Sequence, residues 1–299
     1  MEVPLTAFLS LRSRLLPLAL TGVVLLTVTG SARAQDPTDP NPGAITLTTG
    51  IDFPSAYFFR GIRQESDPKF TTFAFGDVGI ALFSGDGGLK SAGVNFGVWN
   101  SLHTGSSGSD VSGQGIHYEE DFYVSLSLGF GGGVTVTPMF TAYTSPNGLF
   151  TTVKEFSFKV SHASKFAPYG LIALEFGGND SGQADGGHLP GQNGDKGTYA
   201  EFGVGPSWPL AGGKATVAIP VKVGLSLKDY YELSGTDNKF GYVDGGILFT
   251  VPFSSAPTSF GLWNIHGGVN ILGFGDTTKA LNNGDGSEVV ASIGIGMSY

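Results

Sequence analysis

Apolar residues occupy every second position along several stretches of this chain. In residues 288–299 the odd positions are apolar, and the even positions are mostly small or polar. Residues 217–228 and 121–130 show the same alternation. A period of two residues is typical of a β-strand with one apolar and one polar face. No comparable stretch shows a helical period, so we predict an all-β fold.

Counting such stretches predicts about twelve strands. Short connections alternate with longer ones that are rich in Gly, Asp and Asn, a layout that places all the long loops at one end. A closed up-and-down antiparallel barrel has this layout. The expected strands lie near residues 45–60, 69–83, 92–104, 118–130, 134–144, 151–162, 169–178, 198–210, 215–231, 239–253, 262–274 and 287–299.

The composition indicates which solvent surrounds the barrel. Only 14% of the residues are charged, which is too few to cover the exterior of a barrel that faces water. With lipid outside, the apolar positions of each strand (the apolar parity) face the acyl chains, and the small or polar positions that alternate with them (the lumen parity) line a water-filled lumen. The last strand ends in Tyr299, and such a terminal aromatic resembles the signal read by the barrel-assembly machinery. We therefore predict a transmembrane barrel in the outer membrane, with outer-membrane lipid as a partner.

Five prolines fall inside the expected strands, where each removes a hydrogen-bond donor from the ladder. In a barrel without edges they would have to lie at bulges or near the rims. At least one strand is then shorter than the pattern suggests, and ten or fourteen strands remain alternatives. The prolines are Pro138, Pro206, Pro209, Pro220 and Pro252.

The first 34 residues are predicted to be a cleaved secretory signal peptide. Arg12 and Arg14 precede a short apolar run that ends in small residues at Ala34. A membrane anchor is the alternative, but the run is shorter than the roughly 20 residues of a spanning helix. Residues 35–43 then form a Pro-rich tail, and residues 44–299 a single barrel domain.

The overall charge and the missing cysteines exclude several classes of protein. The net charge is −9, which argues against nucleic acid as a partner because phosphate binding needs clustered Lys and Arg. With no cysteine, the chain can form no disulfide and no thiolate metal site. We expect no cofactor and no metal.

The segment "AYFFRGIRQ" carries the only two arginines beyond the N-terminal region, Arg60 and Arg63. If the first strand continues through it, Tyr57 and Phe59 reach the aromatic girdle at the outer interface. Arg60 then turns inward at the mouth of the lumen. It either pins the first loop to acidic residues of neighbouring strands, or it guides anions; a guanidinium suits the pin because it binds a carboxylate in bidentate fashion.

Residues 45–130 also resemble the opening of the TorF family of Gram-negative outer-membrane porins. The resemblance rests on Phe59–Gln64 of the "FRGIRQ" segment and on a later strand with Trp99, Asn100 and Ser101. Arg63 stands where that family usually has Ser, and the rest of the chain matches only as a general barrel. The resemblance implies an outer-membrane channel without indicating its solute.

We therefore predict a channel for passive diffusion of small hydrophilic solutes or ions. With the apolar parity toward lipid, acidic residues outnumber basic ones on the lumen side, which favours a weak cation preference. The candidate pore-lining residues are Arg60, Asp121, Glu155, Lys159, Glu175, Glu201, Lys222, Lys228, Asp244 and Glu288. If the lysines cluster at the constriction, the channel would instead prefer anions.

Two other functions remain open. A barrel of about twelve strands is narrow enough for side chains to plug it, which would make the protein a structural or adhesive barrel without conductance. A barrel hydrolase is the second alternative, because His188 lies near Asp185 and His117 precedes an acidic run. Neither group carries a recognisable nucleophile motif, so we expect no enzyme and no catalytic residue.

Overall fold

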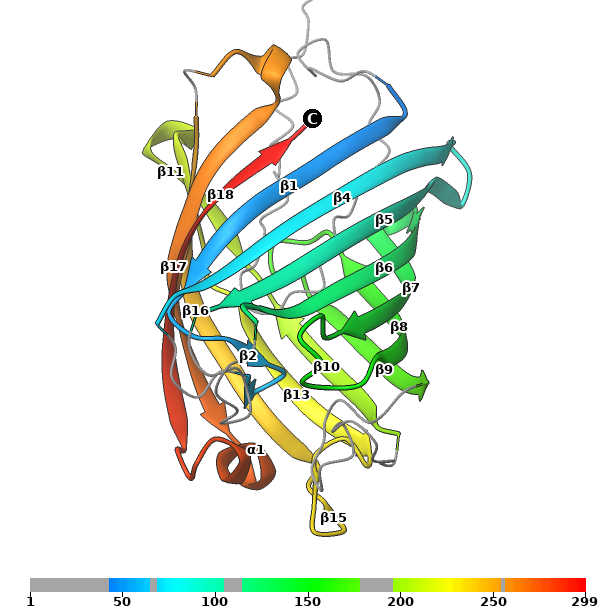
Figure 1. Cartoon of the computed structure of the whole chain (residues 1–299). Coiled ribbons are helices and arrows are strands. Elements are labelled where there is room, and N and C mark those ends of the chain that lie inside the picture. The colour runs from blue at the N-terminus through cyan, green and yellow to red at the C-terminus, as the bar shows by residue number, and fades with distance from the viewer. Residues whose placement is uncertain (1–42, 65–68, 105–114, 178–195, 254–255) are drawn as a thin grey trace, which may run out of the picture.

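A closed antiparallel β-barrel forms the body of the molecule (Figure 1). The computed structural model describes residues 43–64, 69–104, 115–177, 196–253 and 256–299. The sheet closes through β1 with β18 and through β16 with β17. Two strands of the barrel are interrupted: one consists of β10 and β11, the other of β12 and β13. The barrel therefore has the 12 strands predicted from the alternation.

Its strands are β1 (Ile45–Pro54), β4 (Thr71–Ser84), β5 (Leu89–His103), β6 (His117–Phe130), β7 (Val134–Thr144), β8 (Val153–His162), β9 (Tyr169–Gly177), β10 (Thr198–Val204), β11 (Ser207–Leu210), β12 (Ala215–Ala218), β13 (Val221–Lys228), β16 (Phe240–Pro252), β17 (Leu262–Phe274) and β18 (Ser287–Ser298). Outside the barrel sheet lie β2 (Phe58–Phe59), β3 (Ile62–Arg63), β14 (Glu232–Leu233), β15 (Thr236–Asp237) and α1 (Asp276–Leu281). Among the described residues, no helix has the length and apolar character of a membrane span.

The prolines explain why two strands are interrupted. Pro206 separates β10 from β11, and Pro220 separates β12 from β13. Across these breaks the Ile219 N–H donates to the Pro206 carbonyl, and the Gly246 N–H donates to the Pro220 carbonyl. Pro138 lies in β7 where the ladder to β6 skips positions, and Pro252 is the last residue of β16. These four prolines therefore lie at breaks, irregularities and strand ends, whereas Pro209 lies inside the short strand β11, opposite Thr216 of β12.

The apolar parity faces outward, as predicted for a barrel in lipid. In β18, Val289, Ile293 and Ile295 are exposed, whereas Gly294 and Gly296 are buried in the interior. The same division holds around the wall, with exposed Phe122, Phe156, Ile172, Val243 and Ile271. A continuous apolar exterior has no favourable contact with water, so it identifies an outer-membrane type of barrel.

The two ends of the barrel differ. The C-terminus and the start of β1 lie at the upper end in Figure 1, while α1 and β15 lie at the lower end. In outer-membrane barrels short turns face the periplasm and longer loops face outside. We therefore assign the end with α1 to the cell exterior. The expected signal peptide and most of the Pro-rich tail lie outside the described residues.

The first strand departs from its expected range. It ends at Pro54, and residues 55–64 fold into the lumen as a short antiparallel hairpin of β2 and β3, called the lumen hairpin below (Figure 1). Tyr57 and Phe59 are buried inside the barrel, so their prediction as girdle residues is wrong. Arg60 and Gly61 both have positive φ (47° and 83°), which a type I′ turn requires at its two central positions.

Extraction behaviour tests the barrel assignment. We expect the protein to fractionate with outer membranes and to need detergent for extraction, because its exterior is apolar. The folded form should migrate differently on gels from the boiled form, since a closed barrel unfolds only on heating. Recovery of the folded protein from the periplasmic fraction without detergent would contradict the assignment.

Candidate functional site

Arg60 attaches the lumen hairpin to the barrel wall. Its Nη1 and Nη2 donate to the two carboxylate oxygens of Glu155 in β8, at 2.7 and 2.9 Å. Nη1 also donates to the Tyr230 hydroxyl at 2.8 Å, and the guanidinium lies 4.2 Å from the ring centroid of Tyr199. Arg60 and Glu155 are 6% and 1% exposed, so this is a buried, bidentate ion pair. Arg60 is thus a pin, and its charge is engaged by Glu155.

The backbone of the hairpin is held by the outer loops. Asn282 follows α1, donates from Nδ2 to the Gly61 carbonyl and accepts the Arg63 N–H at Oδ1, both at 2.8 Å. The Tyr231 hydroxyl donates to the Arg60 carbonyl. Arg63 also pairs with Glu288 of β18. The hairpin is therefore fixed from several sides, and its turn cannot move without breaking these bonds.

Aromatic side chains fill the space between the hairpin and the wall. Tyr57 donates to Glu119 at 2.7 Å and packs edge-on against Phe73. The first cluster comprises Tyr57, Phe59, Phe73, Phe75, Trp99, Tyr118, Tyr143 and Val153. A second cluster comprises Leu171, Ala173, Tyr199, Tyr230, Tyr231 and Tyr242. These sides of the hairpin are consequently closed by packed side chains.

A second polar group surrounds Glu201 of β10. Its carboxylate accepts hydrogen bonds from the hydroxyls of Tyr169, Tyr199 and Tyr242, at 2.6 to 2.9 Å. Lys222 Nζ lies 3.9 Å from an oxygen of Glu201 and 3.9 Å from one of Asp244. These distances exceed a hydrogen bond, so the Lys222 ammonium is attracted by both carboxylates while its protons stay available to the lumen.

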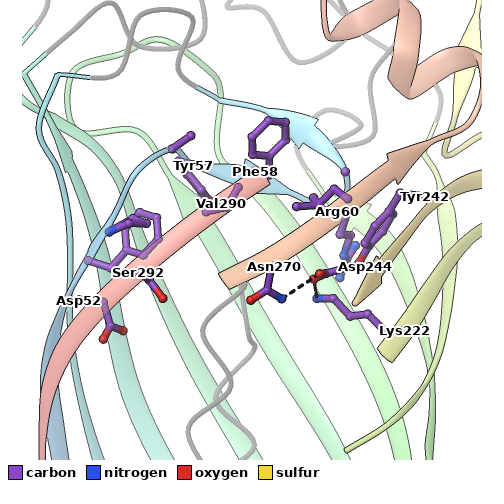
Figure 2. A pocket seen from close by; sticks show the side chains of 15 residues that line it. Asp52, Tyr57, Phe58, Arg60, Lys222, Tyr242, Asp244, Asn270, Val290 and Ser292 are labelled. Atoms are coloured by element: carbon purple, nitrogen blue, oxygen red, sulfur yellow. Dashed lines mark hydrogen bonds and ion pairs between the residues drawn. The ribbon is translucent and has the colours of Figure 1, made fainter. Parts of the chain in front are cut away.

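A pocket lies between the hairpin and the wall formed by β1, β13, β16, β17 and β18. Figure 2 shows Asp244 with its hydrogen-bonded neighbour Asn270 beside Lys222, while Asp52 and Ser292 line another part. The remaining lining includes Ala56, Phe58, Leu272 and Val290. The pocket thus has charged and amide groups in one part and an apolar surface in another.

The structure brings most of the predicted site residues into the barrel interior, in two groups. Arg60, Glu155 and Asp121 lie in the outer group with the hairpin. Glu201, Lys222, Asp244 and Lys159 lie in the inner group, with Lys159 Nζ 4.3 Å from the Tyr169 ring centroid. Glu175 accepts from the Gly197 N–H at its strand end. Lys228 and Glu288 are more exposed, and each pairs with a neighbour, Asp229 and Arg63 respectively.

Several interior residues were missed by the sequence reasoning. Asp52 accepts from His266 at 2.6 Å, and Asp77 accepts from Asn95 and Tyr123. Both aspartates share the lumen parity of their strands, so a stricter use of the alternation could have found them. Asn282 could not be found, because its contacts depend on how α1 is placed over the barrel mouth.

Two of the described histidines have a close polar partner inside the barrel: His103 contacts Ser101, and His266 contacts Asp52 of the pocket. Ser101 Oγ is in contact with His103 Nε2, an arrangement in which a hydroxyl nucleophile could meet a base. Ser101 and His103 are 0% and 1% exposed, and the His103 ring packs against Tyr57 and Tyr118, so a substrate cannot reach this pair in this conformation. His117 contacts Asn100 rather than a serine, and the His188 segment lies outside the described residues. Within the part of the chain that the structure describes, no cluster of His, Asp and Glu could hold a metal ion.

Comparison with known proteins finds likeness only at the level of the barrel. No protein-family model matches the chain, and no curated protein sequence matches it. Among solved structures, the NanC porin is 14% identical with a TM-score of 0.41, covering 84% of this chain and 98% of its own. The translocator domain of the autotransporter NalP from Neisseria meningitidis is 14% identical with a TM-score of 0.44, covering 87% and 90%.

The outer membrane phospholipase A of Escherichia coli is 10% identical with a TM-score of 0.38, covering 84% of this chain and 92% of its own. A porin, a translocator and a phospholipase thus match about equally, and similarity at this level does not choose among their functions. The TorF resemblance of residues 45–130 stays a prediction.

Proposed function

We propose that this protein is a porin-like outer-membrane channel for passive diffusion of small hydrophilic solutes or ions, narrowed by the lumen hairpin. The observation that carries the proposal is the polar part of the pocket beside the hairpin. Lys222, Asp244, Asn270 and Asp52 line it inside a barrel whose exterior is apolar. A buried charge is costly unless it is paired, hydrogen-bonded or hydrated. The Lys222 ammonium lies 3.9 Å from each of its carboxylate neighbours, beyond hydrogen-bond distance, so water or a solute in the pocket would supply its hydrogen bonds. The resemblance to TorF-family porins supports the same function.

The charges of the inner lumen favour a weak preference for cations. Asp52, Asp77, Glu201 and Asp244 face the lumen there, against Lys159 and Lys222. Arg60 adds little to the field that a passing ion meets, because Glu155 binds its guanidinium on both oxygens. Charges inside a narrow channel with low-dielectric walls act strongly on ions, so the excess of acidic residues should make the channel prefer cations.

A plugged structural barrel is the second candidate. It is favoured by the two buried aromatic clusters and by the bonds that fix the hairpin at Glu119, Glu155 and Asn282. If the hairpin never leaves a passage, the barrel cannot conduct. The outer-membrane location is the same for both candidates.

Planar-bilayer recordings distinguish the two candidates and test the charge preference. We expect wild-type protein to give small single-channel steps, and reversal potentials under a potassium chloride gradient to show a modest preference for K⁺. A variant with residues 55–64 replaced by a Gly/Ser linker of equal length should give larger steps, because the lumen then loses the side chains of the hairpin. Steps from the linker variant but none from wild type would establish the plugged barrel. A clear anion preference would contradict the charge argument.

A further inference from the structure

The lumen hairpin meets the wall differently on its different sides. Toward β4–β8 it is held by buried hydrogen bonds within the first aromatic cluster, from Tyr57 to Glu119 and from Arg60 to Glu155. Toward β10 and the segment after β13, the second cluster packs around Tyr199, Tyr230 and Tyr231. Toward β17 and β18 the contact beside the pocket is smaller and apolar, made by Ala56, Phe58 and Leu272 with Phe274 and Val290. The polar bonds on this side lie at the two ends of the hairpin, from Ser55 to Ala291 and from Arg63 to Glu288 and Asn282.

Phe58 is the centre of this smaller contact. Its ring stacks on Phe274 with centroids 5.6 Å apart and planes 21° apart. Its side chain also lines the pocket, and Figure 2 shows it at one side of the pocket, across from Asp244, Asn270 and Lys222. The Arg63 guanidinium lies 5.2 Å from the Phe58 ring and pairs with the half-buried Glu288. One aromatic ring thus separates the polar pocket from a partly exposed ion pair at the barrel mouth.

We propose that the solute route passes between the lumen hairpin and the β17–β18 wall, through the pocket, and that Phe58 is the gate residue that closes it. This inference rests on the proposed channel function. The Phe58 side chain makes no hydrogen bond, so its ring can turn away while Arg60, Tyr57 and Asn282 keep the hairpin backbone in place. An apolar constriction of this kind blocks hydrated solutes by excluding water, even when the gap is not filled by atoms.

The two neighbouring phenylalanines of β2 provide a matched pair of variants. Phe58 and Phe59 are both buried, at 8% and 6% exposure, but they point to opposite sides of the hairpin. Phe59 packs edge-on against Tyr143 in the first cluster, which the proposed route does not cross. Phe58→Ala should therefore open the route, and Phe59→Ala should not. Phe58→Leu keeps an apolar side chain and disturbs the packing least, so it should fold normally and give an intermediate result.

Thiol labelling measures access to the pocket without depending on ion current. The chain has no cysteine, so single substitutions are read without background. Ser292→Cys reports on the pocket, which Ser292 lines, and Asp285→Cys reports on the exposed outer loop. Intact cells are treated with a small, membrane-impermeant cationic methanethiosulfonate, and each variant's heat-modifiable migration confirms its folding. We expect Phe58→Ala to speed labelling of the thiol at position 292 by about tenfold or more. This is the rate increase expected when the equilibrium constant for closing the gate falls tenfold, because the pocket is then open for about ten times as much of the time.

The outcomes separate the gate from the channel. The inference holds if Phe58→Ala speeds labelling at position 292 and enlarges the current steps, while Phe59→Ala does neither and the thiol at position 285 is labelled equally in all backgrounds. It is overturned if the two alanine variants behave alike, or if Phe58→Ala and Phe58→Leu both leave labelling unchanged. Faster labelling in Phe58→Ala with no current from wild type, either alanine variant or the linker variant would sustain the gate and refute the proposed channel.

Discussion

Replacing Arg60 with alanine should destabilise the barrel by about 3–5 kcal/mol, the usual cost of removing one partner from a buried ion pair. Glu155 is 1% exposed, and it would keep the weaker 3.1 Å hydrogen bond from the Tyr143 hydroxyl in place of a charged partner. The hairpin turn would also lose its attachment to Tyr230. The urea midpoint of unfolding in detergent micelles, followed by tryptophan fluorescence, measures the loss.

Arg60→Lys should recover only part of this stability, because an ammonium cannot engage both oxygens of Glu155 in the planar geometry of a guanidinium. Arg63→Ala is the matched control, since it removes the other arginine of the same hairpin. The side chains of Arg63 and Glu288 are 18% and 30% exposed, so their loss should cost about 1 kcal/mol or less. Equal midpoints for the Arg60 and Arg63 alanine variants would refute the pin.

A methyl group at Gly97 should be costly although glycine is normally a weak residue in a strand. The Tyr123 side chain lies directly against Gly97, and a Cβ there would lie 2.0 Å from Tyr123 Cζ and 2.2 Å from its hydroxyl. The ring would have to leave Asp77, whose carboxylate it reaches at 2.8 Å and which is 2% exposed. Overpacking together with a lost buried hydrogen bond predicts a destabilisation of about 2–4 kcal/mol for Gly97→Ala.

Gly76→Ala controls for the general effect of glycine replacement. Gly76 lies on the neighbouring strand β4, pairs with Val98, and has no atom within 4 Å of an added Cβ. It faces lipid, so its replacement should change the unfolding free energy by no more than about 0.5 kcal/mol. Unfolding midpoints measured in the same micelles decide the comparison. A tolerated Gly97→Ala would show that Tyr123 does not need its position against the wall.

The architecture of the barrel follows from local features of the chain. Alternation with period two decides which face of each strand is apolar, and a low charge content leaves lipid as the solvent for that face. Strands β7 and β17 begin and end at the predicted residues, because alternation and turn signals agree there. Pro206 and Pro220 also act locally, since a missing N–H interrupts a ladder wherever it falls. These properties depend on neighbours in sequence, and so the sequence by itself determined them.

The lumen was decided by the tertiary structure. The alternation continues from β1 toward Phe59, and no local sequence signal predicts that the chain leaves the barrel sheet after Pro54. The hairpin turns inward because Glu155, Tyr230 and Asn282, which are 95, 170 and 222 positions away from Arg60 in the chain, converge on its turn. The conformation of Arg60, with its positive φ, is stabilised by those distant partners together with Tyr199 and Tyr231. Parity could place a carboxylate inside the barrel, but only closure of the sheet sets which charges meet, and therefore where the barrel is filled and where a pocket remains.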